Sequence, residues 1–246
     1  MNTFKQIGVI GSGAMGRGIA QLFATAGVPV LLYDSRSEAT EEALQANRAL
    51  LERSAAKGKL SSEALATALA CMRPAVSLEA LADCDLLIEA IVENLDAKQG
   101  LFRALEQVVR ADAVLATNTS SLSVSLIASA CQHPERVAGF HFFNPVPLMK
   151  IVEVVRGELT DPQVIERLAT LAGHAGHFAA TTPDSPGFLV NHAGRAFGPE
   201  ALRILGEGIA TPAQIDRILK DSLGFRMGPF ELFDLVGLDI CHAVME

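Results

Sequence analysis

Three glycines between Gly11 and Gly16 stand at a spacing that lets a phosphate group approach a backbone turn. Gly11 allows the tight turn, and Gly13 has no side chain, so a pyrophosphate can reach the backbone. Gly16 lets the next helix pack closely on the preceding strand. The run follows an apolar strand pattern at 6–10 and opens a helical pattern at 15–26. Because a helix N-terminus offers N–H groups and a positive dipole end, the pattern predicts a dinucleotide site rather than an ordinary strand-to-helix turn.

An acidic residue ends the next apolar segment. Asp34 follows the predicted strand 30–33 and lies 18 residues after Gly16, where a carboxylate can accept bonds from both adenosine ribose hydroxyls. Its charge would repel a 2′-phosphate, so Asp34 favours NAD over NADP as the cofactor. Arg36 leaves an alternative, because a nearby arginine can receive that phosphate. We interpret Arg36 as a solvated surface residue.

A histidine and a glutamate in apolar surroundings form a second candidate group. His141 lies in a predicted strand at 137–142, and Glu153 lies in the apolar segment 151–155 that follows two prolines. A buried carboxylate needs a partner, and His141 is the natural candidate. Such a pair serves general acid–base catalysis, since the acid fixes the tautomer and orientation of the ring. Spacing alone leaves a purely structural pair or an exposed glutamate open.

The elements that must position these residues alternate between strand and helix. Strands are expected at 6–10, 30–33, 85–91, 114–117, 137–142, 151–155 and 177–180, with helical patterns at 15–26, 38–56, 61–70, 95–109, 123–130 and 161–175. This order predicts an α/β fold, a Rossmann-like doubly wound parallel sheet with helices on both faces. Ligands of such sheets bind beyond the carboxyl ends of the strands, where Asp34, Glu93, the polar run 118–121 and His141 are expected.

The character of the chain changes at 183–187, where two prolines and a glycine mark a boundary. Helical patterns follow at 188–206, at 212–223 and from 229 onward. We therefore predict an NAD-binding domain over 1–184 and an all-helical C-terminal domain over 185–246. The last residues, 238–246, resemble an unfinished helix, which suggests that this helical domain is incomplete. Apolar residues left partly exposed would then be Leu232, Phe233, Leu235, Val236 and Leu238.

Composition narrows the functional classes. The chain has 246 residues, half of them hydrophobic, a net charge of −8 and no basic stripe, so nucleic acid is an unexpected partner. No apolar run is long enough to span a membrane, and no signal peptide is visible. Four scattered cysteines without a CxxC pair, and histidines without ligand spacing, predict no metal site and reduced thiols in the cytoplasm.

Longer motifs give the chain a family resemblance. In chain order they are IGVIGSGAMGRGIAQ, LLIEAIVENLDAKQGLF, LATNTSSLS, RVAGFHFFNPVPLMKIVEVV, TPDSPGFLVN and GFRMGPFELFDLVGLD. The chain resembles the L-3-hydroxyacyl-CoA dehydrogenases, which include the 3-hydroxybutyryl-CoA dehydrogenases, over nearly its whole length. The resemblance implies reversible, NAD-dependent oxidation of an L-3-hydroxyacyl-CoA to a 3-ketoacyl-CoA. Fatty-acid β-oxidation, butanoate metabolism and aromatic breakdown of the phenylacetate type are the pathways that it leaves open, and so is the acyl group.

The resemblance also implies roles for single residues. His141 matches the family's catalytic base and Glu153 its orienting partner. Ser120 matches the serine near the nicotinamide and the substrate oxygen, and Asn191 matches the asparagine that holds the substrate. Lys57 falls in the helical arm that contacts the CoA. The cofactor contacts implied are Gly11, Gly13, Ala14, Met15, Gly16, Asp34, Glu93, Lys98 and Ser120.

Two departures and two alternatives accompany the resemblance. After Asn191 the family usually has an arginine and bulky apolar residues, whereas 192–198 is small and glycine-rich here, so we expect the acyl pocket to differ. The family's helical domain also continues further, and it implies a homodimer through that domain when complete. The alternatives are an NAD-dependent dehydrogenase of a small hydroxy acid without CoA, like the lambda-crystallin-like gulonate dehydrogenases, and a non-catalytic NAD-binding protein.

Overall fold

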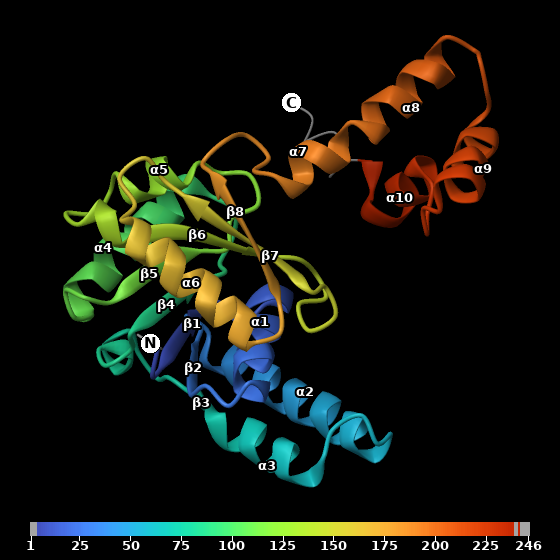
Figure 1. The fold of residues 1–246 in the computed structure, drawn as a ribbon. Helices are drawn as coiled ribbons and strands as arrows, with labels where there is room; N and C mark the ends of the chain where they lie inside the picture. The colour runs from blue at the N-terminus through green and yellow to red at the C-terminus, as the bar shows by residue number, and fades with distance from the viewer. Residues whose placement is uncertain (1–3, 239–240, 242–246) are drawn as a thin grey trace. The chain divides into compact units, whose positions relative to one another are not determined.

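A computed structural model describes residues 4–238 and 241 of the chain. The chain divides into two compact units, Met1–Phe188 and Leu189–Glu246 (Figure 1). Each unit is described by itself below. The helical ending predicted for 238–246 lies outside the described residues, except for 238 and 241.

The first unit is built on one eight-stranded sheet in the order β3-β2-β1-β4-β5-β6-β7-β8 (Figure 1). Its strands are β1 (Ile7–Ile10), β2 (Val30–Tyr33), β3 (Met72–Pro74), β4 (Leu86–Glu89), β5 (Val114–Thr117), β6 (Val137–Phe142), β7 (Ile151–Arg156) and β8 (Phe178–Pro183). Every neighbouring pair is parallel except β6 and β7, which are antiparallel. The predicted doubly wound α/β fold is confirmed, with this one reversed pair.

Helices cover both faces of the sheet. They are α1 (Ala14–Thr25), α2 (Ser37–Ala56), α3 (Ser62–Cys71), α4 (Leu95–Val108), α5 (Val124–Ala128) and α6 (Pro162–His174), with 3-10 turns at Glu79–Leu81 and Pro134–Arg136. Apolar residues of α1 and α6 belong to the core on one face, and those of α4 and α5 to the core on the other. The carboxyl ends of the mutually parallel strands β1 to β6 therefore lie on a common edge of the sheet, whereas β7, which precedes α6, ends at the opposite edge.

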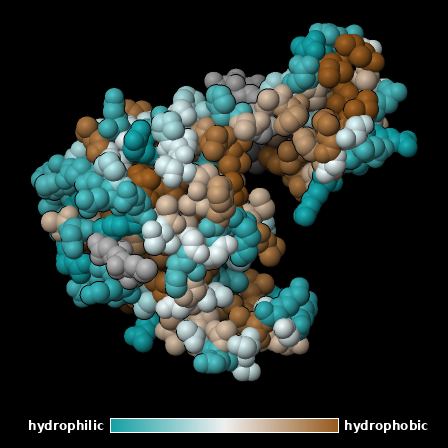
Figure 2. Space-filling view, in the orientation of Figure 1, coloured by the Kyte–Doolittle hydropathy of each residue, from teal (hydrophilic) through white to brown (hydrophobic). Residues whose placement is uncertain are grey.

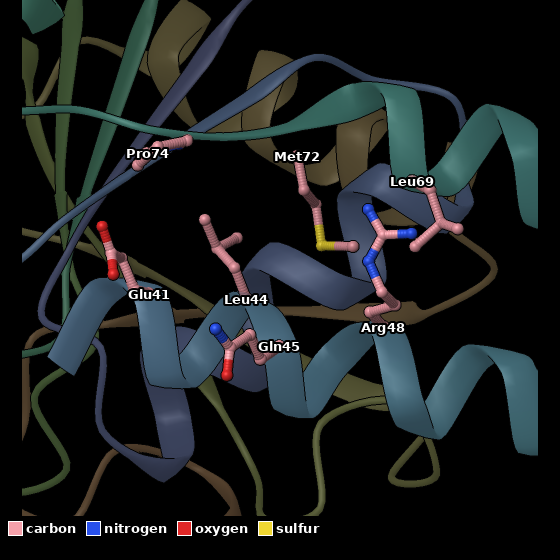
Figure 3. A pocket seen from close by; sticks show the side chains of 7 residues that line it. All are labelled: Glu41, Leu44, Gln45, Arg48, Leu69, Met72 and Pro74. Carbon is pink, nitrogen blue, oxygen red and sulfur yellow. The ribbon is translucent and has the colours of Figure 1, made fainter. Parts of the chain in front are cut away.

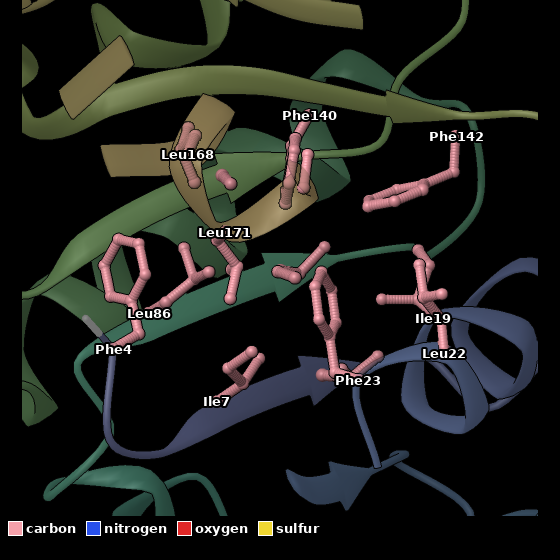
Figure 4. Close-up of a cluster of buried hydrophobic side chains, with 14 of the residues drawn as sticks. Phe4, Ile7, Ile19, Leu22, Phe23, Leu86, Phe140, Phe142, Leu168 and Leu171 are labelled. Atoms are coloured by element: carbon pink, nitrogen blue, oxygen red, sulfur yellow. The ribbon is translucent and has the colours of Figure 1, made fainter. Parts of the chain in front are cut away.

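Alternation along the strands divides the side chains between the two cores. In β4, Leu86 and Ile88 join the core under α1 and α6, whereas Leu87 joins the core under α4. In the first core, the Phe23 ring lies 6.2 Å from that of Phe140 and 5.9 Å from that of Phe142 (Figure 4). Strands buried on both faces read as continuous apolar runs, which is why the sequence revealed them.

The second unit contains α7 (Val190–Arg195), α8 (Phe197–Gly206), α9 (Pro212–Leu223) and α10 (Pro229–Val236). The helix predicted over 188–206 is thus two helices. A buried carboxylate joins α9 to α10: Asp216 accepts the backbone N–H groups of Phe230 (2.9 Å) and Glu231 (3.0 Å). Gly228 permits this contact, because a Cβ there would lie 2.3 Å from the carboxyl carbon of Asp216.

Hydrophobic side chains are exposed on the helical unit (Figure 2). They include four of the five predicted residues, Leu232, Leu235, Val236 and Leu238. The prediction was wrong for Phe233, which is buried: Gly198 brings α8 so close that a Cβ there would lie 3.1 Å from the Phe233 ring. None of the described helices is both long and apolar enough to cross a bilayer.

Candidate active site

The glycine-rich turn between β1 and α1 has the shape that a bound pyrophosphate requires. Gly11 has a φ of +100°, and a Cβ on it would lie 2.4 Å from the carbonyl oxygen of Ala90. A Cβ on Gly16 would lie 1.8 Å from the carbonyl oxygen of Gly11. Around Gly13, in contrast, no non-adjacent atom of the described residues lies within 4 Å of a built Cβ. This open approach ends at the N-terminus of α1, whose first N–H groups have no partners within the helix.

Asp34 is held beside this turn. Its Oδ2 accepts the Ser12 backbone N–H (2.9 Å) and hydroxyl (2.8 Å), and its Oδ1 accepts the Arg36 N–H (3.1 Å). Burial alone would raise the pKa of Asp34, but these hydrogen bonds and the Arg36 charge lower it. The carboxylate is therefore ionised at neutral pH beside the open glycine, as binding of a ribose diol requires. The Arg36 side chain is exposed.

A cleft of about 350 Å³ lies at the carboxyl ends of β4, β5 and β6. It brings together five of the predicted residues: Met15, Glu93, Lys98, Ser120 and His141. Ala90, Ile91, Asn118, Phe142, Phe143 and Asn144 complete its lining. Asn191 lies on α7 of the helical unit, so its contribution belongs to the proposal below and not to this cleft.

The β6–β7 pair joins the predicted histidine and glutamate. His141 is directly opposite Glu153 in the antiparallel register, and its Nδ1 lies 2.6 Å from Glu153 Oε2. The histidine is 5% exposed and the glutamate fully buried. Rings of Phe143 and Phe188 enclose the imidazole, with centroids 4.4 and 5.7 Å away. Apolar walls and a buried acid together fix the ring in the cleft.

Phe188 closes this wall at an energetic cost. It is the one non-glycine among the described residues with a positive φ, 48°, a region that bulky side chains rarely adopt. Packing against Val124 and Val155 in a small buried cluster compensates. Sequence reasoning treated this position only as the start of a helix.

Glu93 and Lys98 belong to one charged network with Glu89. Lys98 Nζ lies 2.6 Å from Glu89 Oε1 and 3.2 Å from Glu93 Oε2. Burial alone would raise the pKa of Glu93, but the hydroxyl of Thr119 and the Lys98 charge bring it down to about 2. Glu93 Oε1 also accepts the backbone N–H of Ser120 at 2.9 Å. The Glu93 carboxylate therefore organises the turn that presents Ser120. The sequence had predicted Glu93 only as a cofactor contact.

Two polar residues of this region were not predicted: Glu89 ends the buried strand β4, and Thr117 ends β5. Asn118, the first residue of the predicted polar run 118–121, accepts the N–H of Phe142 at 2.9 Å, which joins the ends of β5 and β6. The signal for Glu89 was its carboxylate inside an otherwise apolar run, the same signal that singled out Glu153.

A second cavity, of about 610 Å³, is basic. Lys57 lines it together with Arg17, Arg53 and Lys59. The segment Asn144–Leu148, which follows His141 in the chain, lines it as well. Arg53 and Lys57 stand four residues apart at the end of α2, a spacing that places them on one helix side. That spacing was a signal the sequence analysis did not use.

A third hollow, of about 290 Å³, lies between α2, α3 and the edge strand β3 (Figure 3). Its described lining is Glu41, Leu44, Gln45, Arg48, Leu69, Met72 and Pro74. None of these residues was predicted as functional, and none lines the cleft at His141 or the basic cavity at Lys57. Among the described residues, no group of three or more histidine, cysteine or acidic side chains is arranged to hold a metal ion.

Comparisons with known proteins show the family of this chain. The family model for the 3-hydroxyacyl-CoA dehydrogenase NAD-binding domain matches residues 6–184, and the model for the C-terminal domain matches residues 187–246. The cleft at His141 therefore lies in the NAD-binding domain of a 3-hydroxyacyl-CoA dehydrogenase. The chain belongs to the 3-hydroxyacyl-CoA dehydrogenase family, and NAD is the cofactor of its N-terminal domain.

Individual relatives are similar over nearly the whole chain. The 3-hydroxyadipyl-CoA dehydrogenase of Escherichia coli K12 is 44% identical over 99% of this chain and 51% of its own. A probable 3-hydroxybutyryl-CoA dehydrogenase of Bacillus subtilis is 40% identical over 98% of this chain and 84% of its own. A crystal structure of an E. coli 3-hydroxybutyryl-CoA dehydrogenase aligns with a TM-score of 0.96 at 44% identity, covering 98% of this chain and 51% of that one. The chain thus spans about half the length of the E. coli proteins.

Proposed function

We propose that this protein catalyses the reversible, NAD-dependent oxidation of an L-3-hydroxyacyl-CoA to a 3-ketoacyl-CoA. The observation that carries the proposal is the buried contact of 2.6 Å between His141 and Glu153 in a cleft that also holds Ser120. The family and the glycine turn support NAD as the cofactor. The His141–Glu153 pair in the cleft supports the acid–base step.

Each residue of the site has a separate role in this reaction. His141 accepts the 3-hydroxyl proton on Nε2, because Nδ1 is engaged by Glu153. Glu153 orients the ring and balances the positive charge that the proton brings. Bound NAD⁺ would supply the acceptor for the hydride of C3, so that loss of this hydride and of the hydroxyl proton leaves the carbonyl. Ser120 positions the substrate oxygen, and the family resemblance assigns Asn191 a role in holding the substrate. In the reduction, the hydride and the proton move in the opposite direction.

The basic cavity gives the CoA moiety a site. Arg17, Arg53, Lys57 and Lys59 place four cations around one hollow next to the segment that follows His141. A CoA carries its negative charge on its nucleotide phosphates, whereas its thioester end is neutral. We therefore assign the phosphates to this cavity and the acyl end to the His141 cleft.

A homodimer through the helical unit is part of this proposal. Hydrophobic side chains such as Leu205, Ile218 and Leu235 are exposed there, and such patches mark interfaces. Light scattering should give about twice the 26.0 kDa mass of one chain. A monomer with full activity would contradict this part.

The test of the activity is NADH oxidation with 3-ketoacyl-CoA substrates. The E. coli relatives carry names for a short acyl group and for a dicarboxylic one, so acetoacetyl-CoA and 3-oxoadipyl-CoA are the first two substrates. We expect turnover of at least one. Turnover of gulonate with no thioester turned over would instead identify a small hydroxy-acid dehydrogenase, and NAD binding without any turnover would identify a non-catalytic protein.

A further inference from the structure

One buried carboxylate beside the cleft has no part in the chemistry described so far. Glu89, at the end of β4, is 0% exposed and lines no part of the cleft. It accepts hydrogen bonds from the Ile91 N–H (2.7 Å), Lys98 Nζ (2.6 Å) and the Thr117 hydroxyl (2.6 Å). All three partners donate, which an ionised carboxylate requires. Burying such a charge costs free energy, because the carboxylate loses its hydration.

The charges of the network do not cancel. Lys98, 1% exposed, is the single cation among the described residues that line the cleft, and it contacts both Glu89 and Glu93. Glu93 stays ionised in neutral solution because its pKa is about 2. Two carboxylates and one ammonium leave one excess negative charge. Without Glu89, the Lys98–Glu93 pair would be neutral.

That excess charge faces a ligand whose own charge changes during the reaction. The nicotinamide ring carries a positive charge in NAD⁺ and none in NADH, while the rest of the cofactor is the same. Interactions between charges are stronger in a partly buried site than in water. We propose that Glu89 raises the affinity of this site for the oxidised cofactor relative to the reduced one, through its electrostatic field and its ion pair with Lys98, without contacting the cofactor. This inference rests on the proposed function, because hydride transfer from a substrate held at His141 requires the nicotinamide in the same cleft.

The test is equilibrium binding of three ligands to the intact chain, without substrate. Glu89→Gln removes one charge and keeps the size of the side chain. The ratio of the Kd for NAD⁺ to the Kd for NADH should rise about fivefold, the order expected for one unit charge near a partly buried ring. ADP-ribose lacks the nicotinamide, so its Kd should stay unchanged. A merely structural role of Glu89 would weaken all three ligands together and leave the ratio as it is.

Two variants control for other effects of the substitution. In Glu89→Gln/Lys98→Met the network again carries one negative charge, so the Kd ratio should return to the wild-type value even if both cofactor forms bind more weakly. Glu106→Gln breaks another buried ion pair, between Glu106 on α4, the helix that also carries Lys98, and Arg136 at 3.3 Å. Neither residue of this pair lines the cleft. That variant should leave the ratio unchanged.

An unchanged ratio in folded Glu89→Gln would overturn the inference, and so would a ratio that the double variant does not restore. Where Glu89→Gln does not fold, Glu93→Gln removes a charge of the same network from a side chain that is 35% exposed, and it should raise the ratio in the same direction. Failure of the proposed function is a separate result, because it appears as absent thioester turnover in the wild-type protein.

Discussion

His141 and Glu153 are direct partners across the antiparallel pair β6–β7, although twelve residues separate them in the chain. The turn between β6 and β7 therefore sets the strand register that brings these two side chains together. A slip of one residue in this register would send the Glu153 side chain to the opposite face of the sheet. Phe142 and Val152, the next pair in the register, are both buried in the core, which opposes such a slip.

Two glycines of the nucleotide turn should respond differently to the same methyl group. Gly16→Ala places a Cβ 1.8 Å from a backbone oxygen, so the protein should lose about 1–3 kcal/mol or more of stability. Gly13→Ala meets open space, so its melting temperature should stay near the wild-type value, whereas NAD binding should fall at least tenfold by calorimetry. Wild-type NAD affinity in Gly13→Ala would remove the pyrophosphate from this turn.

Lys57 should act on the nucleotide end of the substrate alone. Lys57→Ala should raise the KM for acetoacetyl-CoA several-fold. A hydrogen bond between charged groups contributes about 1.5–3 kcal/mol, and less where the side chain is exposed, as that of Lys57 is. The KM for acetoacetyl-pantetheine, which lacks the nucleotide, should not change. Arg48→Ala, on the same helix but lining the separate hollow in Figure 3, is the matched control. Equal effects on both substrates would refute the assignment.

Glu93 should make the free energy of unfolding depend on pH. Folding lowers the pKa of Glu93 from 4.5 to about 2. The ionised carboxylate therefore contributes fully to the free energy of unfolding above about pH 4.5, and this contribution is lost as the pH falls toward 2. Glu93→Gln should therefore be less stable than the wild type at pH 7, with a gap that narrows below about pH 4.5. Urea unfolding between pH 7 and pH 3.5 measures this. Glu158→Gln, at an exposed site, should follow the wild type throughout, and a pH-independent gap for Glu93→Gln would contradict the network.

Much of the fold could be predicted because strands buried on both faces and amphipathic helices leave clear patterns. The missed strand, β3, is three residues long and ends in Pro74. Proline is tolerated there because β3 is the edge of the sheet, a fact that only the assembled sheet reveals. The break at Ala196 between α7 and α8 likewise lay inside a region with continuous helical spacing.

The candidate site was predictable where single residues carry a chemical pattern, as at Gly13, Asp34 and His141. Contacts between distant segments were not. Glu93 was expected to touch the cofactor, and the structure shows that it also binds the turn at Ser120, 27 residues away. The positive φ of Phe188 depends on packing against two other elements, so no local pattern indicates it.

The central claim is that His141 and Glu153 act as one acid–base unit, and a double-mutant comparison tests it most directly. His141→Gln should lower the rate of acetoacetyl-CoA reduction by about 10² to 10⁴, the usual contribution of a general acid or base. Glu153→Gln should lower kcat as well, because the ring loses its orienting partner. NAD binding should hardly change in either variant, since the glycine turn and Asp34 are untouched.

The deciding measurement is kcat of His141→Gln/Glu153→Gln beside kcat of the two single variants. If the residues form one unit, the double variant should be little slower than His141→Gln alone, because the glutamate has no ring left to orient. If the two losses instead multiply, or if Glu153→Gln keeps full turnover, then the contact of 2.6 Å between these side chains is structural and the proposed mechanism is wrong.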